Sequence, residues 1–186
     1  MSDLSQQALE DATHSWSPAV RYLEETDSTN RVAMEWADQG APEGCLVVAD
    51  FQTAGRGRLD REWFSPAGAS LLFSLILKPG IVVEDLGILS LAGAAAVCGA
   101  LGGVGADPRI KWPNDVRLNG RKVAGILAEA SVEIGRAVSV VLGVGMNVSI
   151  EEDEFPPELR DIATSLLRET GSRADRIEIL CGFLRS

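Results

Sequence analysis

A short segment rich in glycine and arginine has the composition of an anion-binding loop. Residues 55–58 have the sequence Gly-Arg-Gly-Arg, and Arg61 and Trp63 follow closely. Glycine lets the backbone approach a bound molecule, and the planar guanidinium of arginine donates to carboxylate and phosphate oxygens. The spacing matches neither a Walker loop nor a dinucleotide-binding fingerprint. We therefore expect this loop to wrap a phosphorylated ligand, with the indole covering a base; a mobile surface loop is the alternative interpretation.

A second polar segment surrounds a predicted hairpin. Lys111, Asn114 and Asp115 lie just before the hairpin turn, and Lys122 opens the strand that follows it. Gly125, three residues farther on, leaves room for a ligand beside the backbone. Two ammonium groups, an amide and a carboxylate are thus gathered around one turn. We expect a polar binding site here; a solvated turn is the alternative.

A third segment, with the sequence Gly-Val-Gly-Met-Asn at 143–147, ends a predicted strand. Two glycines and an asparagine at a strand end suit close approach of a ligand to the backbone. Alone, this segment is a weak indicator of a binding site; together with the two segments before it, the indication is stronger.

The distribution of charge indicates a local anion site in an acidic protein. The net charge of −10 argues against a general nucleic-acid binder, because contacts to phosphates need a basic face. Residues 55–61 and 109–122 nevertheless hold eight of the 17 Lys and Arg residues, opposed only by Asp60 and Asp115. Cations concentrated in this way favour an anion site, although solvated hairpin charges would give the same pattern.

Other classes of site find little support. Cys45, Cys98 and Cys181 lie far apart without a Cys-x-x-Cys pair, which favours reduced cysteines in a cytoplasmic protein. His14 is the only histidine, which argues against zinc. The longest apolar run, 86–104, is interrupted by five glycines and is expected to be a buried helix rather than a membrane span. Residues 1–14 contain no Lys or Arg, so a secretory signal is not expected.

Predicted strands and helices must position these segments. Periodicity and turn residues predict an α+β fold with one mixed, mainly antiparallel sheet, flanked by helices that pack to one side. Asn119-Gly120 predicts a type I′ hairpin, and Gly135 is expected to turn the next one. Strands are expected at 21–25, 46–51, 70–77, 109–112, 116–118, 122–130 and 137–148. Helices are expected at 4–13, from an N-cap within 27–30 to 39, at 85–101 as a central buried helix, at 161–169 and from 174 onward.

Taken together, the segments resemble the biotin–protein ligase family. The shared motifs are Ser-Thr-Asn at 28–30, the loop 55–63 ending in Trp, Lys-Trp-Pro-Asn-Asp at 111–115, Arg-Lys-Val-Ala-Gly-Ile-Leu at 121–127, and the segment 143–147. They occur in the family's order, and the resemblance covers about residues 22–170. It implies a class II synthetase-like biotin/lipoate ligase catalytic domain that adenylates biotin with ATP and Mg²⁺. The biotin then passes to a lysine of a biotin carboxyl carrier protein.

The resemblance, with the residue types above, assigns roles along the chain. The expected biotin-binding residues are Ser28, Thr29, Gln52, Gly55, Arg56, Lys122 and Gly125. The expected nucleotide-binding residues are Arg58, Arg61, Trp63, Asn114 and Asn147. Lys122, Arg58 and Lys111 are the expected catalytic residues, and Asp115 is the expected metal ligand. No Ser-His or Cys-His set is needed, because the carboxylate of biotin is itself the nucleophile.

The resemblance also sets expectations for organisation and partners. We expect residues 1–186 to form a single catalytic domain, without the small C-terminal β domain usual in the family. Nothing resembles the family's N-terminal winged helix, so neither DNA nor a membrane is an expected partner, and a homodimer is left open. Two alternative functions stay open: a lipoate or octanoate ligase or transferase, and a non-catalytic biotin- or nucleotide-binding module.

Overall fold

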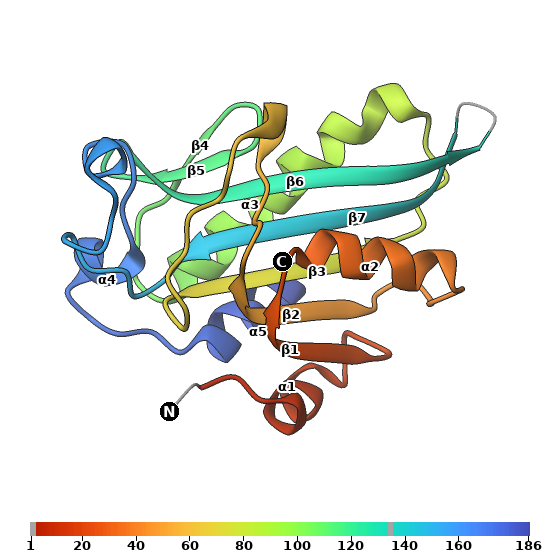
Figure 1. Ribbon diagram of the computed structural model, residues 1–186, viewed down its shortest axis with the longest axis horizontal. Helices are drawn as coiled ribbons and strands as arrows, with labels where there is room; N and C mark the ends of the chain where they lie inside the picture. Colours follow the sequence, from red (N-terminus) through yellow and green to blue (C-terminus); the bar gives the residue numbers. More distant parts are fainter. Residues whose placement is uncertain (1–2, 134–135) are drawn as a thin grey trace.

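Seven strands form one mixed sheet in the computed structural model, which describes residues 3–133 and 136–186 (Figure 1). The strand order is β1-β2-β3-β7-β6-β5-β4. β1 and β2 run parallel, and every other neighbouring pair is antiparallel. The α+β prediction is therefore confirmed. The strands are β1 (Val20–Thr26), β2 (Leu46–Gln52), β3 (Ser70–Leu77), β4 (Arg109–Lys111), β5 (Asp115–Leu118), β6 (Arg121–Glu133) and β7 (Arg136–Asn147).

Helices cover both faces of this sheet, so the expectation that they pack to one side was wrong. Along β2, Leu46 and Val48 join the core beneath α3 (Leu86–Gly103) and α5 (Arg176–Arg185), whereas Val47 joins a smaller core beneath α2 (Thr29–Asp38). Strand side chains alternate between faces, so each face acquires its own apolar layer. The helices are α1 (Gln6–Thr13), α2 (Thr29–Asp38), α3 (Leu86–Gly103), α4 (Leu166–Thr170) and α5 (Arg176–Arg185), with 3₁₀ turns η1 (Arg58–Asp60), η2 (Val83–Asp85) and η3 (Pro157–Leu159).

The long apolar helix α3 is not central, contrary to expectation. It buries small residues such as Gly93 and Ala94, while Ile88 and Leu91 are 63% and 41% exposed. The segment Val83–Gly103 is long and apolar enough to cross a membrane by length and composition, and it packs here against β6 and α5. The prediction was wrong because the helix is apolar all round, yet only one of its sides packs against the sheet.

The expected helix at 161–169 was also wrong in its first half. Ala163 forms a parallel bridge with Lys122, because Lys122 N donates to Ile162 O and Thr164 N donates to Lys122 O, each at 2.8 Å. The α4 helix starts only after Ser165, whose hydroxyl accepts from Arg168 N. Residues 162–164 thus pair with the start of β6 on the side opposite β5.

The predicted type I′ turn between β5 and β6 is confirmed. Asn119 and Gly120 both have positive φ, 46° and 83°. β6 and β7 extend farther than expected, to Glu133 and from Arg136, and the turn predicted at Gly135 lies outside the described residues.

Candidate active site

Alternate residues of β7 form the floor of a cleft on the α2 face of the sheet. Gly143, Gly145 and Asn147 share this face with Val141, which packs in the core beneath α2. Gly125 on β6 is the cross-strand partner of Gly145, so this part of the floor carries no side chains. Above it lie a cavity of about 50 Å³ and an adjoining cleft of about 490 Å³. We call them the small cavity and the large cleft.

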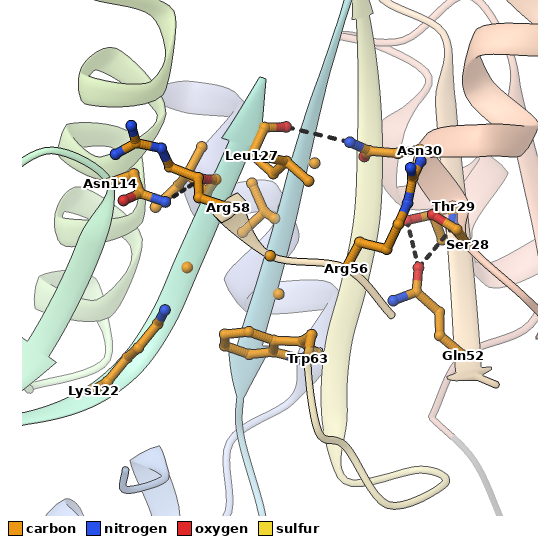
Figure 2. A pocket seen from close by; sticks show the side chains of 16 residues that line it. Ser28, Thr29, Asn30, Gln52, Arg56, Arg58, Trp63, Asn114, Lys122 and Leu127 are labelled. Atoms are coloured by element: carbon orange, nitrogen blue, oxygen red, sulfur yellow. Dashed lines mark hydrogen bonds between the residues drawn. The ribbon is translucent and has the colours of Figure 1, made fainter. Parts of the chain in front are cut away.

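The small cavity is polar at the end next to α2. Figure 2 shows Ser28, Thr29 and Gln52 on one side and Lys122 on the opposite side. Gln52 Oε1 accepts hydrogen bonds from Thr29 N at 2.7 Å and from Thr29 Oγ1 at 2.9 Å. Ser28 takes the N-cap position of α2 without a side-chain capping bond, and it lines the cavity. The start of α2 thus presents polar groups to any ligand that enters.

The arginine-rich segment folds back on itself as a small hairpin over the floor. We call residues 53–65 the Gly-Arg loop. Trp63 N donates to Gly55 O at 2.9 Å, and Gly57 N donates to Arg61 O at 2.6 Å. A Cβ on Gly55 would lie 2.9 Å from the carbonyl oxygen of Trp63, so glycine is needed there. At the tip, Leu59 has a φ of 57° and is 84% exposed, a strained and solvated position for a leucine.

Trp63 lies between the small cavity and the large cleft, and it lines both. The resemblance had assigned Trp63 to the nucleotide-binding residues only. A Cβ on Gly145 would fall 2.6 Å from the indole Cε2, and one on Gly125 would fall 3.0 Å from Cζ3. The indole therefore lies directly on the glycine floor. Its Nε1 is buried without a hydrogen-bond partner in the described part of the chain.

Lys122 reaches the junction of the two cavities. Its Nζ lies 2.7 Å from Asp115 Oδ1 and 5.3 Å from the centre of the Trp63 ring. The side chains of Lys122 and Asp115 are 33% and 22% exposed, so both remain accessible to a ligand. The backbone bonds to residues 162 and 164 fix the base of the lysine side chain.

A buried carboxylate on α4 clamps the turn that precedes Lys122. Glu169 accepts from Asn119 Nδ2 at 2.6 Å, from Arg121 Nη2 at 2.7 Å and from Thr164 Oγ1 at 2.5 Å. Burial raises the pKa of the Glu169 carboxyl, but these hydrogen bonds and the Arg121 charge outweigh burial and lower the pKa overall. The ionised Glu169 thus fixes the hairpin that carries Lys122.

The other predicted nucleotide residues lie in or beside the large cleft. Asn114 Nδ2 donates to Ile126 O, so its amide is committed to β6. Asn147 Nδ2 donates to Thr164 O, and its buried Oδ1 has no partner in the described residues. Arg58, Arg61 and Lys111 line the cleft with exposed side chains. Apolar walls come from Phe64, Phe155, Leu159 and Ile162, which were not predicted.

Asp115 was the predicted metal ligand, and its carboxylate is paired here with Lys122. Among residues 3–133 and 136–186, no three His, Cys, Asp or Glu side chains come together as a metal-binding group. One carboxylate is still compatible with Mg²⁺, which is commonly held by one or two carboxylates together with the phosphates of a substrate.

Asn30, which lines the small cavity, and Glu129, which bonds to Asn30, were not predicted as site residues. Asn30 is 6% exposed and lines the cavity, and Glu129 on β6 bonds to it. The usable signal was the pleat of β6, because Gly125, Leu127 and Glu129 are alternate residues and share the cleft face.

Comparison with known proteins gives consistent matches. The model of the biotin/lipoate A/B protein ligase family matches residues 22–147. The bifunctional ligase/repressor BirA of Bacillus spizizenii is 46% identical over 160 residues, which are 86% of this chain and 49% of that protein. The biotin–[acetyl-CoA-carboxylase] ligase of Mycobacterium tuberculosis is 39% identical over 167 residues, covering 87% of this chain and 59% of that protein.

A solved structure agrees with these matches. The biotin protein ligase from Aquifex aeolicus in complex with biotin and ATP superposes with a TM-score of 0.76 at 36% identity, covering 89% of this chain and 67% of that one. The chain spans about half the length of the BirA proteins that it matches.

Proposed function

Because the chain belongs to the biotin/lipoate A/B protein ligase family, we propose that it carries the catalytic site of a biotin–protein ligase. It converts biotin and ATP to biotinyl-5′-AMP and passes biotin to a lysine of a biotin carboxyl carrier protein. The observation that carries this proposal is the ammonium group of Lys122 at the junction of a small polar cavity and a larger cleft. The names of the relatives support biotin as the substrate.

In the first step, a carboxylate oxygen of biotin forms a bond to the α-phosphorus of ATP, and pyrophosphate leaves with the electrons of the broken P–O bond. The two reactants are both anionic, so they repel each other. Lys122 and Arg58 offset that repulsion and stabilise the charge on the phosphorus oxygens. Ser28, Thr29 and Gln52 hold the polar head group of biotin at the other end of the small cavity.

The nucleotide occupies the large cleft. Its apolar walls accept the base, and the unpartnered Oδ1 of Asn147 can accept a hydrogen bond from an amino group there. Arg61 and Lys111 at the rim attract the phosphates. Asp115 would hold Mg²⁺ beside Lys122, and the ion would neutralise charge on the phosphate oxygens.

The second step joins biotin to the acceptor. The neutral amine of the acceptor lysine attacks the carbonyl carbon of the mixed anhydride, and AMP leaves as an anion. This step depends mainly on position and on keeping water away from the anhydride. The Gly-Arg loop and Trp63 cover that bond, so they limit its hydrolysis.

We also propose a cytoplasmic protein that works without DNA or a membrane. Its cysteines carry no disulfide in the described residues, and its net charge of −10 disfavours phosphate backbones.

Calorimetric titration with biotin, followed by pyrophosphate release with biotin and ATP, tests the proposed function. We expect saturable biotin binding and ATP-dependent pyrophosphate release, and no release when lipoic acid replaces biotin. Release with lipoic acid alone would assign the protein to the lipoate branch of the family. Biotin binding without pyrophosphate release would indicate a binding module.

A further inference from the structure

Glu129 lies next to the small cavity, where it contacts the lining residues Asn30 and Arg56, and it has no part in the chemistry above. It shares the cleft face of β6 with Gly125 and Leu127 because strand side chains alternate. Its Oε2 accepts from Asn30 Nδ2 at 2.7 Å, and its Oε1 lies 3.3 Å from Arg56 Nη2. One carboxylate therefore contacts both the cavity wall and the Gly-Arg loop.

This carboxylate fixes the orientation of the Asn30 amide. Asn30 Oδ1 accepts from the Ser74 hydroxyl at 2.6 Å, and Nδ2 points toward Glu129 and Leu127 O. A flipped amide would place its oxygen against the Glu129 carboxylate, which cannot donate when ionised. The amide also lies directly against the backbone of Gly143, where an added Cβ would be only 2.1 Å from Asn30 Oδ1. The amide thus has one satisfactory orientation.

Polar contacts continue from Asn30 to the residue that precedes the Gly-Arg loop. Ser74 Oγ lies 2.8 Å from Thr29 Oγ1, and Thr29 N donates to Gln52 Oε1. A chain of polar contacts therefore starts at Gln52, runs through the residues that line the cavity, and ends at Arg56 in the loop. Both the entry of the loop and its first arginine are tied to the same wall.

We propose that Glu129 is a positioning residue that couples the Asn30 side of the small cavity to the Gly-Arg loop. It holds the loop over the cavity through Arg56 while keeping the amide of Asn30, which lines the cavity, in one orientation. The inference rests on the proposed function in taking biotin as the ligand. Figure 2 shows Asn30 and Arg56 across the cavity from Lys122, so Glu129 acts on ligand affinity and retention rather than on attack at phosphorus.

Glu129→Gln tests this role, because it keeps the size of the side chain and removes its charge. Glu133→Gln is the matched control, an exposed carboxylate on the same strand. We expect the KM for biotin to rise about three- to tenfold in Glu129→Gln, the scale of a partly exposed ion pair with a charged hydrogen bond. The kcat at saturating biotin should stay within about twofold of wild type, since the transition-state contacts are intact. An unchanged KM, or an equal loss in kcat and in kcat/KM, would overturn the proposal.

A double-mutant cycle tests the route through Arg56. If Glu129 acts through that guanidinium, the effects of Glu129→Gln and Arg56→Gln on biotin affinity should not add. Full additivity would exclude the coupling.

Tryptic cleavage at Arg58 and Arg61 supplies a readout that needs no ligand. Ligand-free Glu129→Gln should be cut in the loop faster than wild type or Glu133→Gln, at an unchanged melting temperature. Equal cleavage would overturn the proposal that Glu129 holds the Gly-Arg loop, even if biotin proved not to be the substrate. Failure of wild type to bind biotin would instead refute the proposed function.

Discussion

The indole of Trp63 lies so close to Gly145 that a Cβ there would fall 2.6 Å from its Cε2. The closest neighbour is a ring held in a loop and not an immobile backbone, so a substitution must displace the ring.

Gly145→Ala should push Trp63 off the glycine floor and weaken biotin binding by about tenfold or more. Overpacking of this kind costs about 1–3 kcal/mol of unfolding free energy. Calorimetry and urea denaturation measure the two effects. Gly102→Ala is the control, because a Cβ there meets nothing within 4 Å. In a Trp63→Ala background, Gly145→Ala should cost little further stability. A loss of the same size without the indole would contradict this explanation.

Ligand entry should move Trp63. The small cavity of about 50 Å³ is far below the ~300–1,000 Å³ typical of small-molecule sites, and the indole N–H is buried without a partner in the described residues. We expect biotin to change tryptophan fluorescence, and Trp63→Phe to abolish that change. Trp16→Phe, at a partly exposed position beside Arg185, should retain it. A full signal in Trp63→Phe would show that the ring does not respond.

Lys122→Gln should abolish most adenylate formation without unfolding the protein. Loss of one charge-assisted contact to a transition state costs about 2.7–4 kcal/mol, or roughly 100- to 1,000-fold in rate. Biotin binding should remain near normal, because the head group lies at the other end of the small cavity. Lys78→Gln, an exposed lysine outside the cleft, is the control. Pyrophosphate release within about tenfold of wild type would remove Lys122 from the mechanism.

Glu169→Gln should destabilise the protein in a pH-dependent way. The folded state lowers the pKa of this carboxyl below its ordinary value of 4.5, so its stabilisation is complete above that pH and is lost as the pH falls below it. At pH 7 we expect the variant to lose about 1–3 kcal/mol of unfolding free energy, the scale of a buried hydrogen bond to a charged group. The difference from wild type should shrink between pH 5 and pH 3. A constant difference across that range would contradict the linkage.

Sequence reasoning succeeded where a local rule determines the outcome. The type I′ turn at Asn119-Gly120 requires positive φ at both residues, and both have it. The segments around Lys122 and at 143–147 were expected to share one site, and the antiparallel pairing of β6 with β7 brings them together.

It failed where the outcome depends on packing between distant segments. The choice of sheet face for α2, and the ring of Trp63 lying on Gly145, are long-range contacts without a local signature. The contact between Asn30 and Glu129 joins residues 99 positions apart. Residues 161–164 were predicted as helix because nothing local shows that they would pair with Lys122.

The alternate glycines of β7 also act as a ruler. Strand residues advance by about 3.3 Å each, so Gly143, Gly145 and Asn147 mark positions along the cleft that span about 13 Å. A rigid strand cannot stretch to suit its ligand, so the site should select acid substrates by their length. A homologue of biotin with one more methylene would bring its carboxylate out of register with Lys122 while its ring stayed beside α2. Discrimination against such an acid should therefore appear in kcat/KM, at about 10- to 200-fold for a single methylene.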